Sequence, residues 1–251
     1  SDVPQGGVVL KKGARLTPAA IGMVASIGRA YVKVYRRLRV GIFFSGDELV
    51  QPGEPLPPGG IYNSNRFMIR SLLQELGCEA LDLAFESAAA SADVILTTGG
   101  MSVGEEDHIK PAVEAVGSLN VWRVRLKPGK PLAFGEVRGV PFIGCPGNPV
   151  AGFVVFLMMA RPYLLRTMGL TDIDVKPMAV RADFDWLKPG DRQEFVRVRR
   201  NDEGGLDLYH TQNSQVLSSC AWADGLVDIP VGGTVRKGDM VSYYPFCQFF
   251  A

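Results

Sequence analysis

The sequence predicts an α/β protein: a doubly wound, mostly parallel sheet followed by a small all-β domain of barrel or sandwich type. Strand-like and helical patterns alternate from about residue 38 to residue 170, which is typical of a parallel sheet covered by helices. From about residue 171 the helical periodicity stops, and short alternating segments follow, separated by paired glycines. We therefore expect an N-terminal segment 1–37, an α/β domain 38–170 and a C-terminal β domain 171–251.

The N-terminal segment predicts two short strands and one helix. Residues 8–10 are Val-Val-Leu and residues 31–34 alternate in polarity, so both favour strands. Between them, Thr17-Pro18 is typical of an N-cap followed by proline at the first helical position, and Gly28 is suited to the helix end.

Four apolar runs predict the strands of the α/β domain, at residues 40–44, 80–83, 94–97 and 121–126. Helices are expected from Asn63 or Ser64 to Leu76, near residues 107–116 and over residues 150–168. In the β domain we expect strands at residues 194–199, 206–210, 225–229 and 234–243.

The connection between strands 80–83 and 94–97 is short. Two parallel neighbours need a crossover of about a dozen residues or more, most of it a helix that returns along the strand. Only residues 84–93 are available. We predict either that residues are missing between Leu83 and Ser87, or that these two strands are not parallel neighbours.

Three turns of ligand-binding type follow strands of the predicted sheet. After residue 97, Gly99, Gly100 and Gly104 open a loop before a helix, and such a loop offers backbone N–H groups and a helix N-terminus to an anion, most often a phosphate. Residues 146–149, Pro-Gly-Asn-Pro, form a second turn from strand to helix. Ligands bind just past the carboxyl ends of strands in such sheets.

The remaining turn holds two cations. Lys127 and Lys130 flank Pro128-Gly129, and because proline fixes the backbone, both ammonium groups are pre-positioned. The alternative is a solvated basic turn. Three carboxylates, Asp47, Glu48 and Asp107, stand at strand or loop ends, where they can hold Mg²⁺ against phosphate oxygens, although Asp107 also suits a helix cap.

Composition excludes several classes of partner. The 251 residues are 47% hydrophobic and 21% charged, and the net charge of +1 gives no overall field toward nucleic acid or membrane. The four cysteines form no CxxC pair, so we expect reduced thiols and no structural zinc site. No apolar stretch approaches the ~20 residues of a membrane span, and we expect a cytoplasmic protein.

Five motifs occur in one order: SGDEL at 45–49, YNSN at 62–65, TTGGMSVGEED at 97–107, KPGKPLAFG at 127–135 and PGNP at 146–149. Together they resemble the molybdopterin-binding fold of molybdopterin adenylyltransferases, the gephyrin E domain and the molybdenumtransferases of the MoeA type. The resemblance extends from about residue 7 to residue 246. It favours the MoeA type, because the adenylyltransferases lack the C-terminal domain. Segment 1–37 is then the remnant of a larger N-terminal linker region.

The resemblance implies a transferase of molybdenum cofactor biosynthesis. It would bind adenylylated molybdopterin, cleave the adenylate with Mg²⁺, release AMP and insert molybdate into the pterin dithiolene. The implied catalytic residues are Asp47, Glu48, Asp107, Lys127 and Lys130, with Asp107 and Glu48 as metal ligands. The implied substrate-binding residues are Gly46, Thr98, Gly99, Gly100, Ser102, Gly104, Pro146, Gly147, Asn148, Pro149, Arg197 and Ser214. Since Lys127, Lys130 and Arg197 would recognise only charge and shape, we expect sulfate to compete with molybdate.

The sequence departs from the family pattern at two places. Ala151 stands where the family commonly has serine, and the family's acidic pair is absent after Leu83. The resemblance also implies a homodimer in the full-length protein, and we expect this chain alone to be poorly active because the family site is completed by the N-terminal region. Two other functions remain open, a molybdopterin adenylyltransferase and a gephyrin-like scaffold that binds peptide.

Overall fold

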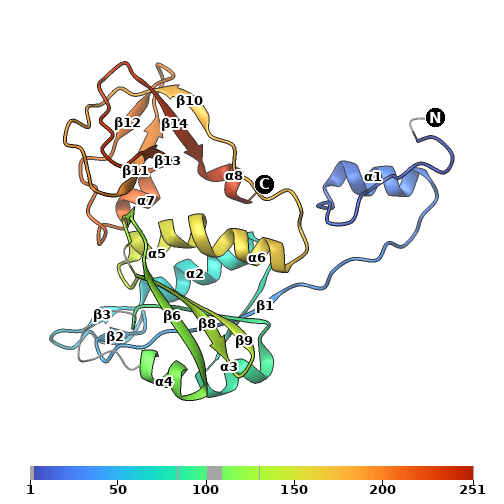
Figure 1. Ribbon diagram of the computed structural model, residues 1–251, viewed down its shortest axis with the longest axis horizontal. Helices are drawn as coiled ribbons and strands as arrows, with labels where there is room; N and C mark the ends of the chain where they lie inside the picture. Colours follow the sequence, from blue (N-terminus) through green and yellow to red (C-terminus); the bar gives the residue numbers. More distant parts are fainter. Residues whose placement is uncertain (1–2, 84, 101–108, 130, 251) are drawn as a thin grey trace.

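The computed structural model describes residues 3–83, 85–100, 109–129 and 131–250 (Figure 1). Helix α1 (Pro18–Ser26) lies on an arm that extends away from the body, and none of its residues is buried. Thr17 caps α1 as predicted, accepting a hydrogen bond from the Ala20 backbone at 3.2 Å. The two strands predicted in this segment are wrong. Residues 8–10 and 31–34 form no strand, because no described segment pairs with their backbone.

The first sheet has six strands in the order β4-β1-β5-β9-β8-β6. Strands β4, β1, β5 and β9 run parallel, and β8 and β6 add an antiparallel edge. Their bounds are Arg39–Phe43 for β1, Glu79–Asp82 for β4, Val94–Thr98 for β5, Gly117–Arg123 for β6, Pro131–Val137 for β8 and Val140–Cys145 for β9. The predicted mostly parallel sheet is therefore confirmed. Strand β8, formed by PLAFGEV, was not expected, because those residues were assigned to a ligand turn.

Strand β1 lies between β4 and β5 and pairs with both in parallel. The second alternative for the short connection therefore holds: β4 and β5 are not neighbours. Helix α3 (Phe85–Ser91) carries the chain past β1, and Ala84, which joins it to β4, lies outside the described residues.

Helices cover both faces of this sheet, as a doubly wound fold requires (Figure 1). One face packs against α2 (Ser64–Glu75), α5 (Pro149–Val155) and α6 (Arg161–Thr167). The other packs against α3 and α4 (Ile109–Val116). Alternate residues of β5 point to the two faces: Val94 and Leu96 lie in the first core and Ile95 in the second. Asn63 caps α2, as one of the two predicted caps.

A π-helical turn, η1 (Phe156–Ala160), joins α5 to α6 in one continuous helix. By length and composition alone this helix, Pro149–Thr167, could cross a membrane, so the expectation that no apolar stretch is long enough was wrong. Of its apolar window, 61% is buried inside the protein, as in the core helix of a globular domain.

The second sheet has the order β10-β14-β13-β11-β12. The bounds are Met178–Arg181 for β10, Gln193–Arg200 for β11, Leu206–Leu208 for β12, Gly225–Ile229 for β13 and Met240–Pro245 for β14. A parallel bridge between Ala182 and Leu206 brings the chain after β10 to β12, which closes the sheet toward a barrel. The short strand β7 (Leu126–Lys127), from the α/β part of the chain, pairs in parallel with β11.

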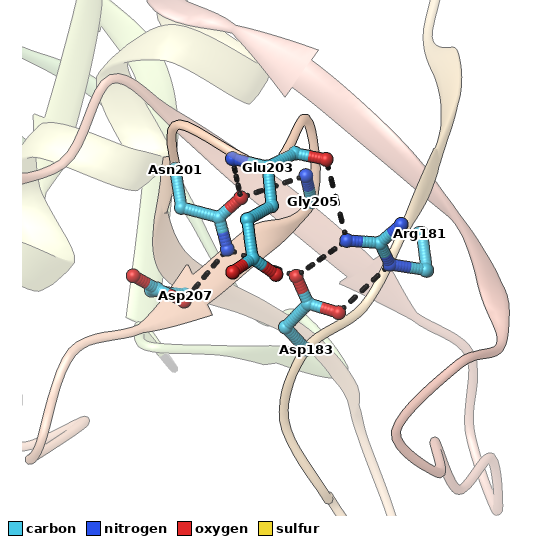
Figure 2. A network of polar contacts seen from close by, with 6 residues as sticks. All are labelled: Arg181, Asp183, Asn201, Glu203, Gly205 and Asp207. Carbon is cyan, nitrogen blue, oxygen red and sulfur yellow. Dashed lines mark hydrogen bonds and ion pairs between the residues drawn. The ribbon is translucent and has the colours of Figure 1, made fainter.

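Figure 2 shows a polar network that holds this closure. Arg181 makes two hydrogen bonds to Asp183, at 2.8 and 3.0 Å, and Asn201 donates to both Asp183 and Asp207. The Asn201 side-chain oxygen accepts the backbone N–H groups of Glu203 and Gly205, so the 201–205 turn is held by one amide. The guanidinium of Arg181 keeps the pKa of the Asp183 carboxyl well below its usual range.

The two sheets share a core. Phe195, Leu226 and Phe249 of the C-terminal part are buried together with residues of α5 and α6. Arg161, which is 5% exposed, donates to the carbonyls of Phe249 and Ile173 and stacks over the Phe249 ring. Helix α8 (Phe246–Phe250) is thereby fixed to α6. This shared core sets the distance between the turns of the first sheet and the loops of the second.

Candidate active site

A cavity of about 930 Å³ lies where parallel strands of the first sheet end and the β domain begins. Strands β1, β5 and β9 lead into it through Phe44-Ser45, Gly99-Gly100 and Pro146-Gly147. The β domain contributes Arg192, Ser214 and Gln215. This is the position at which open α/β sheets bind ligands. A second cavity, of about 1020 Å³, lies between the N-terminal arm and the ends of α2 and α6, and it includes none of the predicted site residues.

The glycine turns after β5 and β9 touch through their backbones. A side chain at Gly147 would meet the Gly99 Cα at 3.2 Å, and Gly99 has a φ of +86°. The Gly99 N–H donates to the Cys145 carbonyl at 3.0 Å. Only glycine allows this approach, which brings two of the predicted turns together at one end of the cavity.

Asn65, on the first turn of α2, links these turns. Its side-chain amide donates to the Gly147 carbonyl at 2.7 Å and to the Thr98 hydroxyl at 3.0 Å. Its other polar atom, Oδ1, is buried without a partner among the described residues, as is the hydroxyl of Thr97. Asn65 was not among the predicted site residues, although it belongs to the YNSN motif.

Ser214 joins the β domain to the Pro146–Gly147–Asn148–Pro149 turn. Its hydroxyl accepts from the Asn148 side chain at 3.2 Å, and its carbonyl accepts from the Val150 backbone at 3.1 Å. The second contact satisfies one N–H at the start of α5. Ala151, at the position where the family commonly has serine, lines the cavity and is 3% exposed.

Lys127 forms a salt bridge with the buried Glu194. Its ammonium lies 3.0 Å from a carboxylate oxygen of Glu194, whose side chain is 7% exposed, whereas that of Lys127 is 43% exposed. The pairing follows from the alignment of β7 with β11, which places Lys127 beside Glu194. Lys127 is not among the residues that line the cavity. Lys130, the second cation of the predicted anion pocket, lies outside the described residues.

Arg197 is a fully buried cation, 1% exposed. Its guanidinium donates to the Ser219 hydroxyl at 3.2 Å and to the carbonyls of Phe195 and Asn213 at 3.3 and 3.5 Å. Burial lowers its pKa to about 10, and within the described part of the chain no carboxylate forms a salt bridge with it. Arg197 does not line the cavity; it contacts the backbone of Asn213, next to Ser214, on the side away from the cavity.

Of the carboxylates predicted to bind metal, the structure describes Asp47 and Glu48 but not Asp107. Asp47 and Glu48 are exposed, and Glu48 lines the cavity with its carboxylate close to Gly46, where a side chain would meet it at 2.5 Å. Asp107 lies outside the described residues, together with Ser102 and Gly104. Among the residues that the structure describes, no group of three His, Cys, Asp or Glu side chains forms a metal site.

Two charged residues at the site were missed from the sequence. Arg192 lines the cavity, and Glu194 neutralises Lys127. The sequence signal for Glu194 was a carboxylate on a strand directly before two apolar residues, in QEFVRV. Such a residue is almost never buried without a partner, so this pattern indicates a cation close to Glu194.

Residues 41–166 match a family model described as a probable molybdopterin binding domain, and residues 179–246 match the MoeA C-terminal region (domain IV). A molybdopterin molybdenumtransferase from Haemophilus influenzae is 37% identical over 98% of this chain and 65% of its own length. Molybdopterin molybdenumtransferase 2 from Mycobacterium tuberculosis is 32% identical over 91% of this chain and 61% of its own. A crystal structure of a molybdopterin biosynthesis MoeA protein from Pyrococcus horikoshii has a TM-score of 0.80 at 27% identity, covering 95% of this chain and 62% of that one.

This chain thus spans less than two thirds of the length of these relatives. The Haemophilus alignment also runs over 263 positions, although 98% of the 251 residues here is about 246. The relative therefore holds about 17 residues within the matched region that this chain does not.

Proposed function

The chain belongs to the MoeA family of molybdopterin-binding proteins, and on that premise we propose that it is a molybdopterin molybdenumtransferase. The proposed substrates are adenylylated molybdopterin and molybdate. An oxygen of water or molybdate attacks the adenylate phosphorus, the bond from that phosphorus to the bridging oxygen of the pterin phosphate breaks, and AMP leaves with the new oxygen. The two dithiolene sulfurs then bind molybdenum, and one oxygen of molybdate leaves as water with the two thiol protons. Molybdenum cofactor is the product.

The observation that carries this proposal is that one cavity is built from both sheets. Main-chain turns at Gly99, Gly100 and Gly147 form one side, and Arg192 and Ser214 from the β domain form the other. An adenylyltransferase built on the α/β domain alone has no need of the second side. The combination therefore favours the molybdenumtransferase over the adenylyltransferase.

The chain's own residues supply binding and charge. Backbone N–H groups at the glycine turns are suited to the phosphate groups of the pterin substrate. Lys130 is proposed to neutralise the incoming oxyanion, and Lys127 to join it by exchanging its contact with Glu194 for the anion. Arg197 lies close behind Ser214 as a buried positive charge. Fixed charges aimed at an oxyanion in a partly dehydrated site are the main source of catalysis in phosphoryl chemistry. The sulfur chemistry is that of the pterin.

The residues present are compatible with Mg²⁺. This ion is usually held by one or two carboxylates together with substrate phosphates, rather than by a complete protein cage. Glu48 lines the cavity and is the carboxylate best placed among the described residues. We propose that Glu48 and Asp107 would hold Mg²⁺, with Asp47 as a further candidate ligand, and that the ion would supply positive charge to the phosphate oxygens.

Three further features belong to the proposal. We place the protein in the cytoplasm, where the pterin substrate is made and where its thiols remain reduced. Three of the four cysteines are buried and all are free, and burial raises the pKa of Cys145 to about 12, so this thiol is unreactive. A homodimer is proposed for the full-length protein.

The test is a single-turnover reaction with adenylylated molybdopterin, Mg²⁺ and molybdate, in which the purified protein is in excess over the pterin because low activity is expected of this chain alone. AMP is quantified by chromatography, and cofactor is quantified by reconstitution of a molybdenum-free apoenzyme. We expect AMP and cofactor to appear in equal amounts and only when molybdate is present. ATP-dependent adenylylation of molybdopterin would instead identify an adenylyltransferase. Capture of a peptide partner without any AMP release would identify a scaffold.

A further inference from the structure

The charges that face the cavity differ from those expected. Of the described residues that line it, Glu48 is the carboxylate and Arg192 is the cation. Lys127 does not line the cavity, and its charge is taken up by the buried Glu194 at 3.0 Å. Arg192 therefore stands as a cation at a site that is otherwise built from main chain, hydroxyls and amides.

The guanidinium of Arg192 is only partly engaged by the protein. Its Nη1 donates to the Leu126 carbonyl at 3.5 Å, at the limit of a hydrogen bond. Its Nε lies 3.7 Å from Asp191, whose side chain is 90% exposed, and a pair of this kind contributes little. Within the described part of the chain, its Nη2 has no hydrogen-bond partner. The planar guanidinium thus keeps donors for a bidentate anion.

The backbone that carries Arg192 is held on both sides. The Gln193 N–H donates to the Arg125 carbonyl at 2.9 Å, which attaches the start of β11 to β7. The Gly232 N–H donates to the Gly190 carbonyl at 2.8 Å. Side chains on a fixed backbone lose less entropy when they bind a ligand, so Arg192 is pre-positioned at the cavity wall.

We propose that Arg192 is a substrate-binding residue that donates to a phosphate group of the adenylylated pterin. This assignment rests on the proposed function. The chemistry it recognises is a phosphate ester, carried by either the adenylate half or the pterin half of the substrate. The sheet turns then supply neutral N–H donors, and the β domain supplies the positive charge.

Equilibrium binding of three probes tests the assignment: AMP, adenosine and molybdopterin that has not been adenylylated. The variants are Arg192→Gln, Arg192→Lys and a matched control, Arg199→Gln, which removes the same charge from an exposed position on β11, the strand that begins directly after Arg192. We expect Arg192→Gln to bind AMP, molybdopterin or both about 10- to 100-fold more weakly, the usual effect of losing a charged hydrogen bond. Adenosine, which has no phosphate, should bind equally to all variants.

Arg192→Lys should recover part of the affinity, because it keeps the charge without the planar pair of donors. Loss for AMP alone places the contact at the adenylate, and loss for molybdopterin alone places it at the pterin phosphate. If wild type binds the probes and Arg192→Gln matches Arg199→Gln, the assignment is overturned while the proposed function stands. If wild type binds neither AMP nor molybdopterin, both are overturned. An equal loss for adenosine and AMP would also overturn it, since the change would not concern phosphate.

Discussion

The two sides of the cavity are built in different ways. On the side of the first sheet, Gly99 and Gly147 meet backbone to backbone, and one amide, from Asn65, holds them. On the side of the β domain, Arg192 lines the cavity, and charged side chains outside the lining support it, namely the Lys127–Glu194 pair and the buried Arg197 behind Ser214. The shape of the first side depends on glycines, which have no side chain. The charge of the second side depends on which charged side chains form pairs.

This difference predicts how each side fails. A glycine turn tolerates changes of charge nearby but not added volume. An ionic contact with one buried member tolerates the loss of that member's partner poorly, because the charge that remains is buried and unpaired. Substitutions that remove charge should therefore weaken the β-domain side more than the sheet side.

The largest effect is expected for Lys127→Met. It leaves Glu194 buried without its cation, and we expect a loss of about 3 kcal/mol in the free energy of unfolding, measured by urea denaturation. Glu194→Gln should cost less than about 1 kcal/mol, because Lys127 is half-exposed and water can solvate it.

The double variant Lys127→Met/Glu194→Gln should regain most of the stability that Lys127→Met loses. Additive losses in the two single variants would show that the ion pair has no coupling energy. If a Lys127 variant binds molybdate more weakly, the loss shows a contact between Lys127 and the anion only if the double variant, in which stability is restored, binds molybdate as weakly.

A smaller effect is expected for Asn65→Ala, on the sheet side. The substitution removes the donor to the Gly147 carbonyl and the Thr98 hydroxyl, and we expect a loss of about 1–2 kcal/mol in the free energy of unfolding. Binding of AMP should also weaken, because the two turns lose their link. Gln74→Ala, an exposed amide on the same helix, is the control and should change neither quantity. Unchanged AMP binding in Asn65→Ala would mean that glycine contacts alone hold the turns.

The smallest effect is expected from acid on the closure of the β domain. The pKa of Asp183 is depressed by Arg181 and Asn201, so the folded protein keeps this carboxyl ionised where the unfolded chain protonates it. Its contribution is complete above about pH 5 and is lost as the pH falls below about 4. Asp183→Asn should therefore lose stability less steeply between pH 5 and pH 3 than wild type. Glu203→Gln, in the 201–205 turn of the same polar network (Figure 2), should keep the wild-type slope, and equal slopes in all three proteins would contradict the assignment.

Much of the first sheet was predictable from the sequence, because its signals are local. Apolar runs predicted β1, β4 and β5, the cap at Asn63 predicted the start of α2, and the PGNP turn predicted a strand followed by a helix. The strands predicted on the N-terminal arm failed for the opposite reason. An apolar run forms a strand only when another segment pairs with it, and the described residues provide none there.

The β-domain side of the cavity was not predictable in the same way. Lys127 meets Glu194 only because β7 pairs with β11, across a long separation in sequence. The sequence presents Lys127 and Lys130 as a basic turn, and nothing near them indicates a carboxylate partner. No pattern in the residues around Arg192 indicates that it lines a cavity. Asn65, in contrast, belongs to the YNSN motif, and its side-chain amide could have been predicted to join two turns.

The pairing of β7 with β11 also limits where the chain can be cut into fragments and how domains can be exchanged between relatives. Strand β12 covers residues 198–200 of β11, and β7 covers residues 193 and 194 on the same edge. A C-terminal fragment starting near residue 171 would leave that stretch of edge bare, and an uncovered edge invites association with other chains. The sequence pattern changes near residue 170, but β7, which precedes that point, belongs to the sheet of the β domain. Exchange of the β domain between relatives should therefore succeed only when the β7 segment travels with it.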